Sequence, residues 1–280
     1  MIALTHNQLV IRHHALAMPL WSPPPEGRAA SVRLIQLSDL HFYEYTDPAY
    51  YARVSAHVHA LKPDIIVITG DFIHFGPAHI PAAKAFVESL PQQCALFAVL
   101  GNHDYADTAR SQWMRAMLES TRATLLVNDA RLIRTAGGPL WVAGVDDYKR
   151  GRPDLARALA ATEAQAQAPI LLLSHNPRQF DTLGRYPQAA RTALTLSGHT
   201  HAGHVFLPPL TPIYRFVLKM KYRHGFYARD GRLIYVSSGL GGAAYYINLP
   251  FWRRGFPRFR YNTRPEIAVF SLAAQVSGAA

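Results

Sequence analysis

Five short segments of this 280-residue chain place side chains that could bind a metal ion directly after an apolar run. They read SDLH, GDF, GNHD, SHNP and SGHTH, and begin at Ser38, Gly70, Gly101, Ser174 and Ser197. The side chains that could take part in chemistry are Asp39, His41, Asp71, Asn102, His103, Asp104, His175, His199 and His201. Carboxylate, amide and imidazole ligands without a thiolate are typical of Mn, Fe or Zn, with Mn our first expectation. Since these ligands outnumber the needs of one ion, we expect two divalent ions that share a bridging carboxylate.

Each segment taken alone also has a structural explanation. An Asp or Asn after a strand often forms a turn or caps a helix, and a single His is more often a buried structural residue than a ligand. Five such segments in series are hard to produce by turn chemistry. Together they therefore favour the metal site.

The apolar runs predict strands of a sheet that is covered on both faces. The predicted strands are Val32–Leu37, Ile65–Thr69, Ala95–Leu100, Leu140–Val145, Ile170–Leu173, Ala193–Leu196, Leu233–Val236 and Ile267–Leu272. Helical patterns cover Pro48–Leu61, Ala78–Leu90, Thr108–Ala123 and Asp154–Ala166. This order predicts an α/β fold with a second, mixed sheet, in one domain over residues 1–280. Residues 1–30 are expected to add an edge strand and a Pro- and Gly-rich linker.

Ligands of layered α/β proteins bind beyond the carboxyl ends of the strands. All five segments follow predicted strands, so we expect them to meet at one rim of the fold.

The series DLH, GDF, GNHD, SHNP and GHTH resembles the calcineurin-like metallophosphoesterase superfamily, and the resemblance extends from Val32 to Leu272. It implies a four-layer αββα sandwich of two mixed sheets around a dinuclear centre. It also implies a hydrolase of phosphoester or pyrophosphate bonds, in which a metal-activated hydroxide attacks phosphorus.

The same resemblance implies a role for each of these side chains. One ion would be held by Asp39, His41 and His201, the other by Asn102, His175 and His199, and Asp71 would bridge them. His103 would contact the phosphate and act as a general acid towards the leaving oxygen, and Asp104 would orient His103.

Two further stretches narrow the resemblance to a bacterial, partly membrane-associated subgroup of phosphodiesterase-like proteins. They are LWVAGVDDYKRGRPDLARAL (Leu140–Leu159) and RPEIAVFSL (Arg264–Leu272). The subgroup includes UDP-2,3-diacylglucosamine pyrophosphatases, which act in lipid A synthesis. Its GHTH motif usually continues Gly-Gly-Gln, whereas here Ala202, Gly203 and His204 follow, so the role of His204 stays open. The neighbouring acids Asp146 and Asp147 are better interpreted as loop or turn residues than as site residues.

The positive charge is concentrated in one part of the sequence. The chain carries a formal net charge of +11 and has a pI of about 9.9. Residues 213–264 contain eleven Lys and Arg and one Asp, which leaves +10 in this stretch. We expect lid-like loops at 205–230 and 243–264, whose basic and apolar side chains would bind a lipid-like phosphorylated substrate or an anionic membrane surface. A nucleic-acid platform is a second interpretation, and packing of aromatic rings under Arg stems is a third.

The remaining features exclude some classes of protein. A single cysteine, Cys94, excludes an intrachain disulfide and a cysteine-rich zinc site, and we expect it in the core. With neither a signal-peptide pattern nor a run of ~20 apolar residues, we expect a cytoplasmic enzyme that could contact the inner face of the membrane. A nuclease or cyclic-nucleotide phosphodiesterase with the same centre is the alternative enzyme. A scaffold without activity is disfavoured, because every motif position holds a competent residue.

Overall fold

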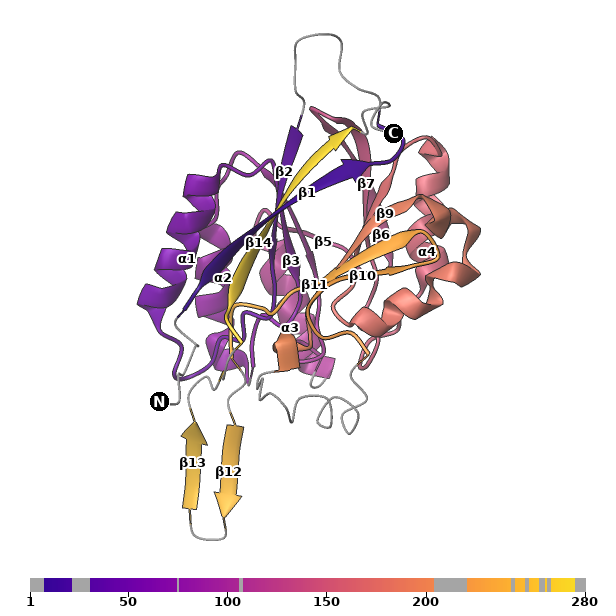
Figure 1. Ribbon diagram of the computed structural model, residues 1–280. Helices are drawn as coiled ribbons and strands as arrows, with labels where there is room; N and C mark the ends of the chain where they lie inside the picture. The colour runs from indigo at the N-terminus through magenta and orange to yellow at the C-terminus, as the bar shows by residue number, and fades with distance from the viewer. Residues whose placement is uncertain are drawn as a thin grey trace, which may run out of the picture.

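The computed structural model describes residues 8–21, 31–74, 76–105, 108–203, 221–242, 245–249, 252–256, 260 and 263–274. Two six-stranded sheets pack against each other, and helices cover their outer faces (Figure 1). This confirms the predicted four-layer α/β sandwich of two mixed sheets.

The first sheet has the strand order β1-β14-β2-β3-β4-β5. Its strands are β1 (Val10–Met18), β14 (Glu266–Ala274), β2 (Ser31–Leu37), β3 (Ile65–Thr69), β4 (Ala95–Val99) and β5 (Thr124–Leu125). Strands β2 to β5 run parallel, and β14 is antiparallel to β2. The N-terminal strand β1 forms one edge of the sheet beside β14.

The second sheet has the strand order β10-β11-β9-β8-β7-β6. Its strands are β10 (Gly225–Arg229), β11 (Arg232–Val236), β9 (Thr192–Ser197), β8 (Ile170–Leu173), β7 (Gly138–Gly144) and β6 (Asp129–Thr135). The four central strands run parallel, and β6 and β10 close the two edges as antiparallel strands.

The helices lie on the outer faces because their apolar sides complete two further cores. The helices are α1 (Pro48–Leu61), α2 (Ile80–Glu88), α3 (Thr108–Glu119) and α4 (Leu155–Ala160), with 3₁₀ segments at Pro77–His79, Ala161–Gln165, Pro177–Arg185, Pro187–Arg191 and His201–Gly203. Helices α1, α2 and α3 pack on the first sheet, and α4 with its neighbouring 3₁₀ segments packs on the second. A third apolar core lies between the sheets, where side chains such as Val67 meet Leu173. Within the described ranges, no helix is both long and apolar enough to cross a bilayer.

Part of the expected lid at 205–230 is a strand. Residues 225–229 form β10 at the edge of the second sheet, so the prediction of a loop there is wrong. The reason is the two-residue turn between β10 and β11, where Asp230 and Gly231 have φ angles of 50° and 73°. Asp-Gly is a strong local signal for such a turn, because both positions need positive φ.

Part of the expected lid at 243–264 is an antiparallel hairpin. Strands β12 (Tyr245–Leu249) and β13 (Trp252–Phe256) pair as a separate two-stranded sheet, drawn beyond the two layers in Figure 1. The side chains of this hairpin lie outside the described residues, as do residues 204–220 with His204.

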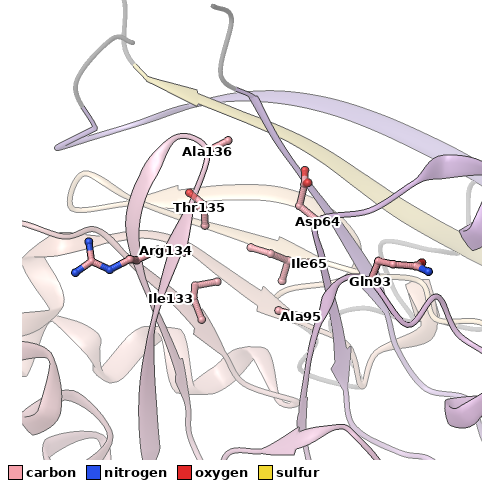
Figure 2. Close-up of a pocket in the computed structure, with 8 residues that line it drawn as sticks. All are labelled: Asp64, Ile65, Gln93, Ala95, Ile133, Arg134, Thr135 and Ala136. Atoms are coloured by element: carbon pink, nitrogen blue, oxygen red, sulfur yellow. The ribbon is translucent and has the colours of Figure 1, made fainter. Parts of the chain in front are cut away.

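A cavity of about 440 Å³ opens at the amino ends of β3 and β4, beside the turn between β6 and β7 (Figure 2). Its lining residues are Asp64, Ile65, Gln93, Ala95, Ile133, Arg134, Thr135 and Ala136. The metal-ligand segments follow the opposite ends of the same strands. Five strand residues span roughly 16 Å at ~3.3 Å per residue, so this cavity is separate from the predicted metal site.

Candidate metal centre

The five segments meet at one end of the sandwich because the strands before them run in matching directions. β2, β3 and β4 are parallel in the first sheet, and β8 and β9 are parallel in the second. The side chains form two adjoining clusters, one of Asp39, His41 and His201 and the other of Asp71, His175 and His199.

The first cluster joins the end of β2 to the segment after β9. His41 Nε2 lies 2.9 Å from His201 Nε2, and Asp39 Oδ1 lies 3.3 Å from His201 Nε2. Asp39 Oδ1 is 3.9 Å from His41 Nε2. All three side chains are buried.

The second cluster joins the ends of β3 and β4 to the ends of β8 and β9. His175 Nε2 lies 3.2 Å from Asp71 Oδ2, 3.2 Å from His199 Nδ1 and 3.3 Å from Asn102 Oδ1. The other ring nitrogen of His175, Nδ1, hydrogen-bonds the carbonyl of Thr69 at 2.8 Å. In a neutral imidazole with the proton on Nδ1, the lone pair of Nε2 points towards the cluster and can bind an ion.

Asp71 lies between the two clusters. Its Oδ2 atom is 3.2 Å from His175 Nε2 in one cluster and 3.5 Å from His41 Nε2 in the other. One carboxylate therefore reaches both groups of nitrogen atoms, which is the position that a bridging ligand needs.

The donor set fits a pair of divalent cations. Two ligand atoms that are each ~2.1 Å from one ion lie roughly 3 Å apart when their bonds meet near a right angle. The spacings in both clusters fall close to that value. Imidazole nitrogens and carboxylate oxygens packed this closely repel one another through their lone pairs unless protons or cations lie between them.

The electrostatic environment of the buried ligand side chains also suits a bound cation. Burial opposes a charged His175, but Asp71 together with the charges of Asp39 and Asp147 raises the pKa of His175 to about 10. Burial alone would raise the pKa of Asp71, but His175 and His103 hold it well below its usual range. Burial, with the charge of His175, lowers the pKa of His199 to about 3. Asp71 is therefore anionic and His175 carries a proton that a bound cation would displace.

The backbone of the site is held in a conformation that residues other than glycine rarely adopt. Five of the candidate ligands have positive φ: Asp39 (51°), His41 (47°), Asp71 (55°), His199 (72°) and His201 (48°). Positive φ is uncommon in residues other than glycine. Each instance costs of order 1–3 kcal/mol, which the surrounding structure must offset. Hydrogen bonds between the segments supply part of this, since Asp39 N–H donates to Gly70 O at 3.0 Å and His41 N–H to Asp71 O at 2.9 Å.

Two glycines let the segments approach each other. A Cβ on Gly198 would lie against Ser38 Oγ and Asp39 Oδ2, and a Cβ on Gly101 would lie against Asp71 Oδ1. The absence of side chains at both positions lets the backbone N–H groups reach the carboxylates. His199 N–H donates to Asp39 at 3.0 Å, and His103 N–H donates to Asp71 at 2.8 Å.

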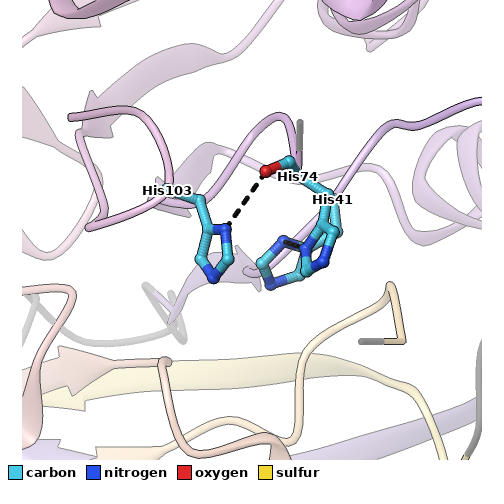
Figure 3. A group of neighbouring side chains, drawn as sticks. All are labelled: His41, His74 and His103. Carbon is cyan, nitrogen blue, oxygen red and sulfur yellow. Dashed lines mark hydrogen bonds between the residues drawn. The ribbon is translucent and has the colours of Figure 1, made fainter. Parts of the chain in front are cut away.

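His103 lies beside the clusters and makes no hydrogen bond to Asp104 through its ring. His103 Nδ1 lies 3.2 Å from the backbone carbonyl of His74 (Figure 3). The family resemblance implies that Asp104 orients His103, whereas the contacts of Asp104 in the structure are with backbone N–H groups. Asp104 is fully buried and accepts from the backbone N–H groups of Gly101 (2.8 Å), Asp71 (2.9 Å), Phe72 (2.9 Å) and Ile73 (3.4 Å). Its carboxylate therefore holds the two ligand segments together.

His74 also lies in the site, although it is not among the residues that the sequence motifs predict. Its ring nitrogen Nδ1 is 3.0 Å from His41 Nδ1, and its ring stacks on His103 with centroids 4.6 Å apart (Figure 3). His41, His74 and His103 form a third group whose ligand atoms lie close together. Its position in the sequence indicates this location, because His74 follows Asp71 by three residues in the same loop.

Several basic residues of the 213–264 stretch are engaged within the protein. Lys221 and Arg229 both pair with Asp181, at 2.5 and 2.7 Å. Arg260 is buried, donates to Ser238 O at 2.7 Å, and lies 3.3 Å from His201 Nδ1. Arg232 donates to Ala189 O at 3.1 Å. The packing interpretation therefore suits Arg260 and Arg232, whereas Lys221 and Arg229 remain exposed although they pair with Asp181.

Asp146 and Asp147 hold a loop, as the sequence reading favoured. Asp146 accepts from Arg152 N–H at 2.8 Å and from the hydroxyl of Tyr105 at 2.5 Å. Asp147 accepts from the backbone N–H groups of Lys149 and Arg150, at 2.9 and 2.6 Å. Cys94 is buried in the core beneath α1 and α2, as expected.

Comparison with known proteins identifies the family of the chain. The sequence profile of the calcineurin-like phosphoesterases matches residues 32–203, and the chain therefore belongs to that family. Phosphodiesterase YaeI of Escherichia coli (strain K12) is 28% identical over 249 residues, which cover 88% of this chain and 84% of that protein. The UDP-2,3-diacylglucosamine pyrophosphatase LpxG of Chlamydia trachomatis is 26% identical over 305 residues, covering 89% and 86%. The uncharacterized metallophosphoesterase YkuE of Bacillus subtilis (strain 168) is 28% identical over 243 residues, covering 86% and 78%. The protein is a metallophosphoesterase, as the resemblance implied.

Proposed function

We propose that the protein hydrolyses a phosphodiester or pyrophosphate bond at a centre of two divalent ions. One observation carries the proposal: two buried clusters of ligand atoms adjoin, and Asp71 lies within 3.5 Å of a nitrogen of each. Asp39, His41 and His201 would hold one ion, and Asn102, His175 and His199 the other. The bound ions would supply charge to the phosphoryl oxygens and an ionised water near neutral pH. Mn is the first expectation for the metal, with Fe or Zn as alternatives.

The chain's own residues would perform the rest of the reaction. His103 borders the clusters, and its ring is partly exposed. The contact of its Nδ1 with the carbonyl of His74 leaves Nε2 as the atom that can face a substrate. That nitrogen would contact the phosphate and give a proton to the leaving oxygen. Asp104 would contribute to the site by fixing the backbone of the GDF and GNHD segments.

The substrate proposed is an amphipathic, phosphorylated molecule at an anionic membrane surface. Two observations support this class. LpxG, a relative of similar length, is named for a pyrophosphate that carries two acyl chains. The basic residues 215 and 219 follow the GHTH segment among apolar and aromatic residues, and the basic residues 253, 254 and 258 lie in a second, aromatic-rich stretch further along the sequence. Such a stretch suits the interface between lipid and water better than a nucleic acid, because aliphatic residues are included.

The test has two stages. Metal-free protein is loaded with Mn²⁺, Fe²⁺ or Zn²⁺, the bound metal is counted, and hydrolysis of an aryl phosphodiester, an aryl phosphomonoester and an acylated nucleotide-sugar diphosphate is measured. We expect two ions per chain and metal-dependent hydrolysis that Asp71→Ala and His201→Ala abolish. Asp129→Ala, which changes a partly exposed carboxylate in the edge strand β6, is the matched control and should keep full activity. Full activity of Asp71→Ala, or one ion per wild-type chain, would overturn the dinuclear proposal.

The second stage decides the substrate class. Binding to vesicles with anionic lipid is compared with binding to single-stranded DNA at rising salt. Stronger binding to vesicles, with preference for the acylated substrate, is expected. Tighter, salt-sensitive binding to DNA would replace the lipid proposal with the nuclease alternative.

A further inference from the structure

The buried loop after β3 contains His74, a residue that none of the proposed ligand roles uses. Its side chain is 5% exposed. The backbone is fixed as well, because His74 N–H donates to Phe42 O at 3.0 Å and Phe42 pairs with Ile73 in an isolated parallel bridge. Burying an imidazole is unfavourable unless its polar atoms find partners. The partners of His74 therefore indicate its role.

The ring of His74 contacts His41 on the side away from the metal cluster. His41 Nε2 faces His201 and Asp71, whereas His41 Nδ1 lies 3.0 Å from His74 Nδ1 (Figure 3). A histidine that gives Nε2 to an ion carries its proton on Nδ1, and that proton needs an acceptor. His74 Nδ1 is placed to accept it.

We propose that His74 is a positioning residue that fixes the tautomer and ring orientation of His41 for metal binding. This inference rests on the proposed metal centre. The partner that orients a ligating histidine is most often a carboxylate, a backbone carbonyl or a water. Here it is the imidazole ring of His74, which contacts His41 Nδ1 without adding a carboxylate beside the two aspartates of the site.

A second contact extends the role of His74 to His103. The carbonyl of His74 accepts from His103 Nδ1 at 3.2 Å, and the two rings stack with an interplanar angle of 19°. The carbonyl remains whatever side chain occupies position 74, but the acceptor nitrogen and the stacking ring do not. Substitutions can therefore remove the acceptor and the ring separately.

The experiment compares His74→Phe, which keeps an aromatic ring and removes the acceptor, with His74→Asn, which keeps an acceptor near the Nδ1 position and removes the ring. Binding of Co²⁺ to each metal-free protein is measured by competition with a chromophoric chelator, together with the visible absorption spectrum of the bound Co²⁺. We expect His74→Phe to weaken one of the two sites by roughly ten- to a hundredfold and to alter its spectrum. His74→Asn should stay close to wild type in both.

The matched control is His14→Leu, which removes a partly buried histidine of β1 that packs on Phe270 in the first sheet and Tyr235 in the second. Its Co²⁺ affinity and the spectrum of its bound Co²⁺ are expected to stay unchanged. If His74→Phe does not fold, His74→Leu takes its place.

The outcomes separate this inference from the proposed function. Two ions bound equally well by wild type and His74→Phe, with the same spectrum, would overturn the positioning role alone. Fewer than two ions in wild type would overturn the proposed centre. Three ions in wild type and two in His74→Phe would also overturn the positioning role, because His74 would then be a ligand of the group with His41 and His103.

Discussion

Replacing Asp104 separates a structural role from a catalytic one. Its carboxylate accepts from three backbone N–H groups at 2.8–2.9 Å and from a fourth at 3.4 Å. Asp104→Ala leaves the three close donors buried without a partner, at about 1–3 kcal/mol each, or roughly 3–9 kcal/mol in total. Water entering the vacated space would recover part of this, so we expect a loss of about 3–5 kcal/mol of unfolding free energy.

The assay is urea unfolding of metal-free protein at pH 8, followed by far-UV circular dichroism. Burial and Asp71 raise the pKa of Asp104 to about 7, so at pH 8 the carboxylate is mostly ionised. The matched control is Asp47→Ala at the start of α1, where one backbone N–H at 2.9 Å loses its acceptor and the expected loss is about 1 kcal/mol. If Asp104→Ala were no less stable than Asp47→Ala but had lost activity, Asp104 would act by orienting His103 and the reasoning would be wrong.

Two further predictions follow from single contacts. Gly198→Ala should weaken metal binding at least tenfold, because the new Cβ displaces Asp39. The control Gly184→Ala, whose new Cβ has neighbours no closer than 3.8 Å, should bind metal like wild type. Equal metal affinities of the two variants in a chelator competition would contradict this prediction. Glu266 is buried, and although burial opposes it, His224 at 2.9 Å holds the pKa of Glu266 below its usual range. Its contribution to stability is therefore present above the ordinary pKa of glutamate and is lost as the pH falls through the lowered value. Glu266→Gln should have a shallower decline of melting temperature between pH 6 and 3 than wild type, and parallel curves would refute the assignment.

Much of the fold could be predicted from local patterns. Helix α1 begins and ends where the sequence predicted, because Asp47 and Pro48 give a cap and a start signal that need no tertiary contact. Strands β3 and β8 also match their predicted bounds, since both are short apolar runs between polar segments. The strand β10, where a loop is expected, is accompanied by a local signal as well, because Asp230–Gly231 is a favoured two-residue turn.

The ligand types of the site could be predicted, but their contacts could not. Asp39 and His201 are 162 positions apart, and strand direction alone indicated that they would share one end of the fold. The left-handed backbone of Asp39, His41 and Asp71 could not be assigned from residue type, because Asp and His adopt positive φ more often than most residues but still only in a minority of cases. It is imposed by hydrogen bonds between segments.

The sequence by itself determined the strand pattern, the five polar segments at the strand ends and the family they belong to. Only the tertiary structure decided which atoms meet. His74 contacts the Nδ1 atom of His41, and the Asp104 carboxylate accepts hydrogen bonds from backbone N–H groups. Arg260 is buried beside His201 and is not part of a charged surface. The physical reason is that periodicity and capping act over a few residues, whereas these contacts arise where two packed sheets bring distant loops within hydrogen-bond distance.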